Sequence, residues 1–405
     1  MKATFLLAAL LVAPAVAAIN IPGANATSGV LDITADTTID LSLAADGAWD
    51  GANTAHGIYD ADEWAVVFNY SSVHIASGTT LTFTNHPSRA PVVWLVSGDV
   101  TIDGVVSLDG QESLNAPLLA EPGPGGFRGA TGYYSAGVGD SAGFGMGGGL
   151  RQAKGGDFGI GDRSYGNPSL VPLIGGSGGS AAAGTRVQGG GGGGGAILIA
   201  CTGTLTVNGT LRANGGDGIP YYFSDRTGGG SGGGIRLVCS DFGGTGTVNA
   251  LGGLGGQSEA ATYGRIRLER ITDTSAGVLS PDPSVVPLSE SDTALVWPPP
   301  TAPEVRIVSI GGEAAPADPR ASFGAAGADV SLAETSSTPI VIETTHVEQA
   351  STVEVRVTPR ADGDAIIVPA AVDSVISTDP LVVQWTATLP VNTGYSAVQV
   401  KVIRP

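Results

Sequence analysis

Residues 92–110, VVWLVSGDVTIDGVVSLDG, align without a gap on residues 197–215, ILIACTGTLTVNGTLRANG. Apolar, small, turn-forming and Asn/Asp positions recur in the same order, which indicates a repeated supersecondary unit. A third copy begins with IRLVC at residue 235 and closes with GTVNALGG at residues 246–253, and a fourth fragment, GRIRLE, begins at residue 264. The copies predict equivalent strands that stack side by side.

Each copy contains three short strands separated by corners, which are Ser97-Gly98, Asp103-Gly104 and Asp109-Gly110 in the first copy. Gly and Asx residues accept the left-handed backbone that such corners need. Three strands and three corners of this kind predict a parallel β-helix with about 20 residues in each coil. The predicted fold class is therefore all-β, a parallel β-helix or solenoid with large glycine-rich insertions, followed by a C-terminal β-sandwich.

The strands VVWLV and ILIAC are apolar on both faces, so another part of the chain must cover their outer face. The inserted segment 111–188 is the predicted cover. Two interpretations of the glycine runs stay open: extended, polyproline-II-like segments packed side by side, or flexible linkers. The first is favoured because the two longest runs lead directly into core strands.

The chain is predicted to contain four parts. Residues 1–18 have the pattern of a secretory signal peptide, with Lys2, an apolar run and small residues before the cleavage site. Residues 19–278 form the β-helix domain, and the proline-rich residues 279–303 form a linker. Residues 304–405 contain seven predicted short strands, which indicates an immunoglobulin-like β-sandwich with Trp385 in its core. We expect a secreted or cell-surface protein with no membrane span in the mature chain.

The chain has 37 acidic and 19 basic residues and a net charge of −18. Such a field repels nucleic acid and anionic lipid, so neither is an expected partner. An acidic loop with Asp46, Asp50, Asp60 and Asp62 could bind calcium through carboxylate oxygens. A solvated loop is the favoured alternative, and no other cofactor is expected.

Cys201 and Cys239 occupy matching positions of the second and third copies. If their strands are neighbours, the Cα atoms lie about 4.8 Å apart, inside the range that a disulfide spans. Two interpretations stay open: a Cys201–Cys239 disulfide, which suits an exported protein, or two buried free thiols.

The sequence contains no recognisable catalytic constellation, and no catalytic residue is assigned. The segment GDSAG at residues 139–143 matches a nucleophile elbow with Ser141 as nucleophile, but GGSGG at residues 175–179 and 229–233 matches the same pattern. Asp103 and Asp109 stand where the second copy has Asn, which favours hydrogen bonding at the corners over acid–base catalysis. A solvated outer face accounts for four arginines, Arg212, Arg236, Arg265 and Arg267.

Aromatic residues gather in the insertions, at Tyr133, Tyr134, Tyr221, Tyr222 and Phe223. Exposed rings on a rigid scaffold stack on sugars or on a protein partner; alternatively, these rings pack over bare glycine backbone. The sequence therefore favours a noncatalytic extracellular structural or adhesive scaffold that binds glycans, a surface polymer or a protein. The alternative is a carbohydrate-active β-helix enzyme, a polysaccharide lyase or glycoside hydrolase.

The signal segment, GGGGGGGAILIACTGTLTVNGTLRANGG, GGGSGGGIRLV and a strand-rich C-terminal domain together resemble large, glycine-rich, exported β-helical proteins of bacteria. The resemblance covers residues 79–269. It implies a pectate-lyase-like coil and a surface location, and it transfers no active-site residue.

Overall fold

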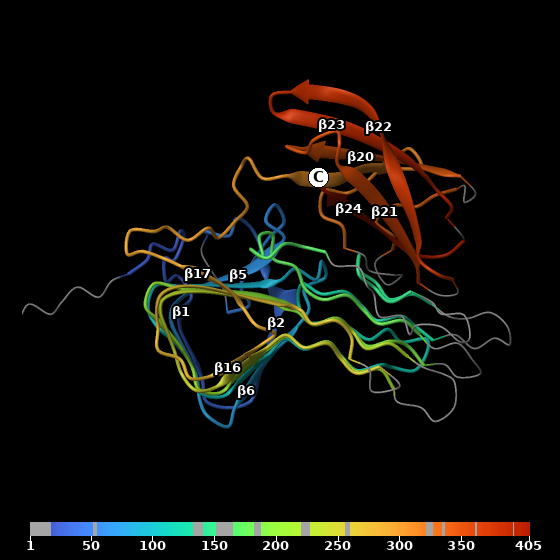
Figure 1. The fold of residues 1–405 in the computed structure, drawn as a ribbon. Coiled ribbons are helices and arrows are strands. Elements are labelled where there is room, and N and C mark those ends of the chain that lie inside the picture. The colour runs from blue at the N-terminus through green and yellow to red at the C-terminus, as the bar shows by residue number, and fades with distance from the viewer. Residues whose placement is uncertain are drawn as a thin grey trace, which may run out of the picture.

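A computed structural model describes residues 18–51, 55–132, 141–150, 165–181, 188–219, 227–255, 260–320, 327–333, 337–360, 363–391 and 393–405. The described chain forms three β-sheets of eleven, six and seven strands (Figure 1). None of its helices is long and apolar enough to cross a membrane.

The eleven-stranded sheet carries the strongest copies of the repeat. Its strands are β1 (Gly29–Ile33), β3 (Ala45–Asp46), β4 (Ile58–Asp60), β5 (Ala65–Ile75), β7 (Val92–Val96), β8 (Val100–Ile102), β10 (Ala196–Cys201), β11 (Thr204–Val207), β13 (Gly234–Gly243), β15 (Arg265–Asp273) and β17 (Ser284–Pro287). All of its pairings are parallel except that of β4 with β5.

The six-stranded sheet is parallel throughout. Its strands, in spatial order, are β16 (Val278–Ser280), β14 (Thr247–Asn249), β12 (Thr210–Arg212), β9 (Val105–Ser107), β6 (Thr80–Thr84) and β2 (Thr37–Asp40). A short 3-10 helix, η1 (Leu41–Leu43), follows β2, and the side chain of Asp40 caps it by accepting from the N–H of Ser42.

Equivalent residues of the repeat pair with one another in register. Ile197 of β10 lies between Val92 of β7 and Ile235 of β13, and Ile235 pairs in turn with Ile266 of β15. The second and third strands of each copy behave in the same way, since β11 pairs with β8 and β12 pairs with β9. The internal alignment therefore predicted the strand pairing correctly.

The all-β class is confirmed, but the predicted architecture is wrong in both halves. The parallel strands close as a six-stranded parallel barrel and do not extend as a β-helix solenoid. The C-terminal strands form one curled antiparallel half-barrel sheet in place of the predicted β-sandwich. The equivalent residues Val92, Ile197, Ile235 and Ile266 are separated by 105, 38 and 31 residues. The copies therefore lack the constant length of a uniform solenoid repeat. Local pattern specified which strands pair, and it did not specify how the sheets close.

The inward side chains of both parallel sheets share one core. Trp94, Ile199 and Leu237 come from three neighbouring strands and are fully buried there. They are joined by Leu81 and Leu211 from the six-stranded sheet. One continuous core thus stabilises all copies of the repeat together.

A second apolar cluster lies on the outer face of the eleven-stranded sheet, around Leu95, Leu198 and Val238. Its cover consists mainly of residues 19–21 and 294–297, near the two ends of the parallel part. Of the described residues in segment 111–188, the predicted cover, Leu173 packs against the cluster. The predicted linker range 279–303 overlaps the end of β16 and contains β17 and part of this cover.

The described glycine runs form an ordered bundle of extended segments, which we call the glycine bundle (residues 108–111, 123–130, 143–149, 175–181, 189–195, 213–218, 228–234 and 250–254). Residues 190–195 donate their N–H groups to three neighbouring segments in rotation. The donor–acceptor pairs are Gly190–Ala130, Gly191–Gly228, Gly192–Gln111, Gly193–Phe127, Gly194–Ser231 and Gly195–Leu108. The acceptor segment repeats at every third residue. The central segment therefore has three residues per turn, which is the geometry of polyproline II.

Glycine is required in this bundle because neighbouring backbones lie too close for a Cβ atom. A Cβ added at Gly193 would lie 2.0 Å from the carbonyl oxygen of Gly176, and one at Gly191 would lie 2.0 Å from that of Gly216. Both distances are far below van der Waals contact. Of the two interpretations of the glycine runs, side-by-side extended segments describe these residues.

The C-terminal half-barrel consists of β18 (Glu304–Ile310), β19 (Glu313–Ala314), β20 (Thr338–Thr345), β21 (Thr352–Pro359), β22 (Ile366–Thr378), β23 (Leu381–Leu389) and β24 (Ser396–Ile403). The long strand β22 pairs first with β21 and then with β23, which curls the sheet. Trp385 lies in the core of this sheet, as predicted, and its indole N–H donates to Thr344 Oγ1 at 2.9 Å.

A buried arginine joins the half-barrel to the glycine bundle. Arg356 of β21 is fully buried, and its Nη2 donates to the carbonyl oxygens of Gly143 at 2.9 Å and Gly148 at 3.0 Å. Gln399 of β24 accepts from the N–H of Gly145 at 3.1 Å. The half-barrel therefore recognises the bare backbone of the bundle through hydrogen bonds.

Candidate functional site

The five aromatic residues predicted to bind a ligand, Tyr133, Tyr134, Tyr221, Tyr222 and Phe223, lie outside the described residues. The residues that border their segments are described, and they adjoin one another. Ala181 N–H donates to the carbonyl oxygen of Ser141 at 3.0 Å, and Gly228 N–H donates to that of Ser180 at 2.9 Å. The described residues that border the two segments therefore lie in the same region of the glycine bundle.

The four aspartates predicted as calcium ligands do not converge. Asp60 is buried, and its carboxylate accepts from the backbone N–H groups of Trp49, Asp62 and Glu63. The carboxylate of Asp60 thus organises the loop, while Asp46, Asp50 and Asp62 are exposed. In the described part of the chain no three His, Cys, Asp or Glu side chains are grouped to hold a metal.

Of the two interpretations left open for the cysteines, the structure, which describes both residues, has no disulfide between them. Cys201 and Cys239 are buried free thiols on neighbouring strands, which is the other interpretation left open by the sequence. Burial raises the pKa of Cys201 well above its usual value and that of Cys239 to about 12. Both side chains pack as small apolar groups in the shared core.

Ser141 is a structural residue and not an accessible nucleophile. It is fully buried, and its hydroxyl donates to the carbonyl oxygen of Thr131. The serines of the two GGSGG segments are also inside the bundle, where Ser231 Oγ accepts from the N–H of Ser177 at 2.7 Å. The hydroxyls of these segments satisfy backbone groups in a region that has almost no other side chains.

The Asp and Asn residues of the corners form the hydrogen-bonded ladder that the sequence predicted. Asn208 Nδ2 donates to Asp103 Oδ1 at 2.8 Å, and Asn214 N–H donates to Asp109 Oδ1 at 2.7 Å. These carboxylates connect neighbouring copies, which leaves them poorly placed for acid–base catalysis.

The solvated-face interpretation of the arginines is wrong for Arg236. Its side chain is only 2% exposed, and its Nε donates to Glu269 Oε1 at 2.8 Å. Arg267 donates to the same oxygen at 2.7 Å. The pKa of Glu269 lies below its usual value, because the two guanidiniums outweigh the effect of burial. Arg236 is buried because other segments cover the outer face of β13, and this cover forms only in the tertiary structure.

A polar junction lies where the parallel part meets the segment that follows β19. It begins with the turn HPSR (residues 86–89), where Arg89 N–H donates to the carbonyl oxygen of His86 at 2.8 Å. The His86 Nδ1 atom lies 2.8 Å from Ser88 Oγ and accepts from the Ser88 N–H at 3.2 Å. Burial lowers the pKa of His86 to about 4, so the ring is neutral at pH 7 and is a weak base.

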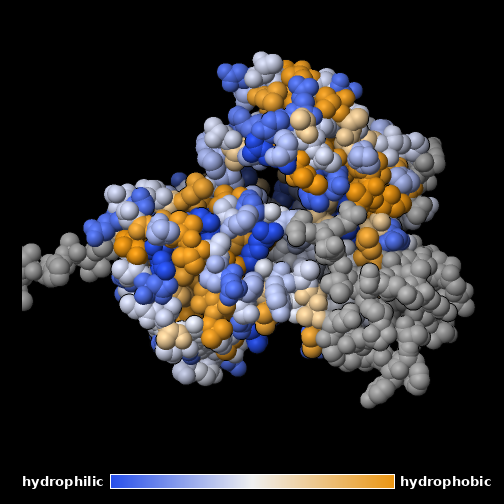
Figure 2. Space-filling view, viewed as in Figure 1, coloured by the Kyte–Doolittle hydropathy of each residue, from blue (hydrophilic) through white to orange (hydrophobic). Residues whose placement is uncertain are grey.

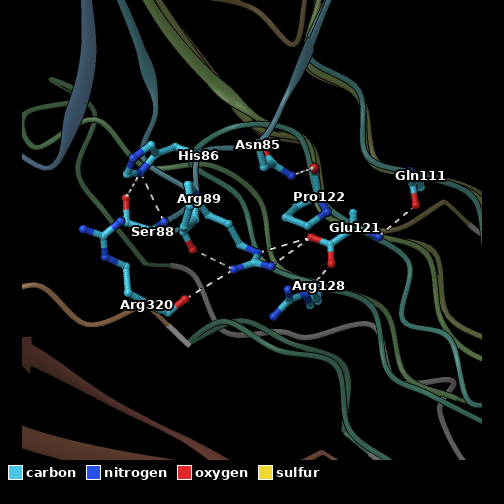
Figure 3. Close-up of polar contacts among 10 residues, drawn as sticks. Asn85, His86, Ser88, Arg89, Gln111, Glu121, Pro122, Arg128 and Arg320 are labelled. Carbon is cyan, nitrogen blue, oxygen red and sulfur yellow. Dashed lines mark hydrogen bonds and ion pairs between the residues drawn. The ribbon is translucent and has the colours of Figure 1, made fainter. Parts of the chain in front are cut away.

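Figure 3 shows Glu121 between two arginine side chains of this junction. Arg89 donates to Glu121 Oε2 at 3.2 Å, and Arg128 Nε donates to Oε1 at 2.6 Å. Burial raises the pKa of Glu121, and the charge of Arg89 opposes that change. The carboxylate ties the turn after β6 to the glycine bundle.

An aromatic stack completes the junction. Tyr59 stacks on His86 with ring centroids 4.0 Å apart, and the guanidinium of Arg320 lies 5.5 Å from the centroid of Tyr59. The hydroxyl of Tyr59 donates to Asp318 Oδ1 at 2.7 Å, and burial is the main reason that its pKa is raised to about 12. Residues from both halves of the chain thus meet in one network. The network joins the parallel part to the segment that follows β19.

One exposed cluster differs from these buried networks. His74 of β5 lies between two carboxylates, with Nδ1 2.8 Å from Asp32 Oδ1 and Nε2 3.5 Å from Asp103 Oδ2. Its hydrogen bond to Asp32 is the main reason that the pKa of His74 is raised. The sequence interpretation missed this cluster because Asp32 and Asp103 lie 42 and 29 residues from His74 along the chain. Only the pairing of β5 with β1 and with β8 brings the three side chains together.

Three comparisons bear on the identity of the chain: no family model, no curated protein and no solved structure matches it.

Proposed function

We propose that this protein is an exported, noncatalytic scaffold that docks onto a surface polymer or a neighbouring molecule. The observation that carries the proposal is the glycine bundle, in which each turn of the central segment 190–195 is hydrogen-bonded to three neighbours. Such a bundle holds segments in fixed positions mainly through backbone hydrogen bonds. Its role is therefore to position what it carries.

The borders of the aromatic-rich segments support an adhesive role. The described residues next to these segments adjoin within the bundle, since Ala181 N–H donates to the carbonyl oxygen of Ser141 and Gly228 N–H donates to that of Ser180. Exposed aromatic rings on a rigid scaffold suit stacking on sugars. The net charge of −18 argues against nucleic acid as the partner.

A carbohydrate-active enzyme is the second candidate, and the cluster of Asp32, His74 and Asp103 favours it. Glycoside hydrolases use two carboxyl groups on either side of the scissile bond. Here both carboxylates face one imidazole ring, whose raised pKa favours the charged form and hence ion pairing. The cluster is therefore better suited to joining strands than to cleaving a glycan.

Incubation of the purified protein with a panel of acidic and neutral polysaccharides tests the proposal. We expect binding in a sedimentation assay with no new reducing ends and no unsaturated products. Turnover that is lost in His74→Ala would show an enzyme and overturn the proposal. Replacing both Tyr221 and Tyr222 with Ala should weaken glycan binding, and replacing the exposed Tyr263 with Ala is the matched control.

A further inference from the structure

Three segments of the chain have the pattern Asn-X-Ser/Thr, in which X is not proline. This pattern marks the acceptor of an N-linked glycan in secreted proteins. The segments begin at Asn25 (NAT), Asn69 (NYS) and Asn208 (NGT). All three lie in the described part of the chain, and each places its asparagine in a different environment. The structure therefore distinguishes sites that the motif alone makes equivalent.

Two of the three asparagines are poor acceptors in the folded chain. Asn69 of β5 is fully buried, and its Nδ2 donates to the carbonyl oxygen of Trp49 at 3.3 Å. Asn208 is exposed, but its Nδ2 donates to Asp103 Oδ1 at 2.8 Å. The hydroxyl of Thr210, the third residue of that motif, is hydrogen-bonded to a threonine of the neighbouring strand. Burial excludes the first site, and the ladder of corner residues occupies the second.

Asn25 lies on the surface, in the turn that precedes β1, and its side chain is bound by the third residue of its own motif. The N–H of Thr27 donates to Asn25 Oδ1 at 3.1 Å, and the hydroxyl of Thr27 donates to the same oxygen at 2.8 Å. Both residues are exposed. The next residue, Ser28, anchors the turn, because its N–H donates to the carbonyl oxygen of Asn69 at 2.7 Å. The motif is therefore presented on a fixed backbone.

Both bonds from Thr27 end on the carboxamide oxygen of Asn25, which leaves the amide nitrogen open to approach. Asn25 Nδ2 makes one long contact at the surface, 3.4 Å to the carbonyl oxygen of Asp50. A hydrogen bond of that length is weak and is easily given up. When Nδ2 bonds to carbon it loses a proton, and negative charge develops on the carboxamide. Donors already directed at Oδ1 stabilise that charge.

We propose that Asn25 is the acceptor of an N-linked glycan, with an oligosaccharide carried on a polyprenyl pyrophosphate as the donor. Nδ2 of Asn25 forms a bond to C1 of the first sugar, and the bond from C1 to the phosphate oxygen breaks. The polyprenyl pyrophosphate leaves with that electron pair, and the proton of Nδ2 passes to a base of the transferase. The inference goes beyond the proposed docking role and needs only the predicted export, which brings the chain to the donor.

Transfer to the purified, folded, unglycosylated full chain tests the inference, with an oligosaccharyltransferase, the lipid-linked donor and peptide mass spectrometry of each site. A proteolytic digest of the same protein is the comparison, because unfolding frees Asn69 and Asn208. We expect glycan on Asn25 in both samples, and occupancy of the other two sites about tenfold or more lower in the folded chain than in the digest. An unmodified Asn25 in the folded chain, or equal occupancy of Asn25 and Asn208 there, would overturn this inference and leave the scaffold role intact.

Two substitutions of Thr27 test the role of its hydroxyl. Thr27→Val keeps the size of the side chain and removes the hydroxyl donor, so we expect the occupancy of Asn25 to fall about tenfold or more. Thr27→Ser keeps the donor and is the matched control, with occupancy close to that of the unmodified chain. Thr27 is exposed, so both variants should fold, which thermal melting verifies. Equal occupancy in Thr27→Val and the unmodified chain would contradict the inference.

Discussion

The glycine bundle and the shared core of the parallel strands keep neighbouring parts of the same chain in order by opposite means. In the core, side chains such as Trp94 and Ile199 are fully buried and fill the space between the sheets. In the bundle, backbone N–H and C=O groups of segments such as 190–195 bind one another directly. The core is therefore sensitive to atoms that are removed, and the bundle to atoms that are added.

The two regions also differ in how they meet the rest of the molecule. Apolar segments cover the outer face of the strands, at Ile19, Ile21, Ala294 and Val296. The bundle instead exposes carbonyl oxygens to the half-barrel, and the guanidinium of Arg356 donates hydrogen bonds to two of them. Figure 2 shows hydrophobic and hydrophilic residues interspersed over the described surface of this face of the molecule.

Gly193→Ala should give the largest effect, because its Cβ would lie 2.0 Å from the carbonyl oxygen of Gly176. Overpacking of this severity costs about 3 kcal/mol or more of the free energy of unfolding. Urea denaturation measures the change. The control is Gly47→Ala, whose Cβ would have Ile58 at 3.7 Å as its nearest neighbour. Equal stabilities of the two variants would contradict the close-packed bundle.

Arg356→Met should be nearly as damaging at the contact between the bundle and the half-barrel. The substitution removes the donors to Gly143 and Gly148 and leaves those buried carbonyl oxygens with fewer partners. We expect a loss of about 2–4 kcal/mol, together with faster proteolysis between the two parts. Arg306→Met, which removes an exposed ion pair with Glu343, is the control. A protease pattern unchanged in Arg356→Met would show that this arginine does not hold the parts together.

His86 should make the junction sensitive to acid. Its pKa is lowered to about 4 in the folded protein, whereas an unfolded histidine titrates near 6.5. Between these values the unfolded chain binds more protons, so stability is fully present above about pH 6.5 and falls toward pH 4, by about 3 kcal/mol in total.

Thermal melts at pH 7 and at pH 4.5 measure this loss. His86→Asn keeps an acceptor for the Ser88 N–H and cannot titrate, so its melting temperature should depend less on pH. An identical pH dependence in the variant and in the unmodified protein would assign the acid sensitivity to other groups.

Ile199→Val should give the smallest effect and complete the comparison. It removes one methylene from a well-packed core, at a cost of about 1 kcal/mol. One carbon removed from the core would then cost less than one carbon added to the bundle at Gly193. Denaturation midpoints of the two variants provide the measurement, and the reverse order would refute the proposed difference between the regions.

The sequence predicted strand positions well where local pattern decides them. Six of the seven strands predicted after residue 304 correspond to β18 and to β20 through β24, whereas residues 329–332 form no strand. Alternation of apolar residues and turn residues at the ends set these strands. The curl of the sheet was not predictable, because it depends on β22 changing its partner from β21 to β23.

The candidate site was much less predictable than the strands. Tyr59, His86 and Glu121 stand far apart in sequence and carry no shared motif, and only folding places them with Arg320. A solvated outer face was the simplest interpretation of Arg236 from the sequence, but the burial of that face depends on other segments. Sequence pattern reports which side of a strand a residue occupies, but it does not report what covers that side.

The sequence by itself determined the all-β class, the register of the repeated strands and the places where only glycine is found. These properties follow from local periodicity, from turn residues and from the repeat, all of which act over short distances along the chain. The tertiary structure alone decided that the sheets close as a barrel and a half-barrel, that the cysteines stay free, and that a buried arginine binds the glycine bundle. Those outcomes depend on the packing of segments that are distant in sequence, and no local pattern encodes it.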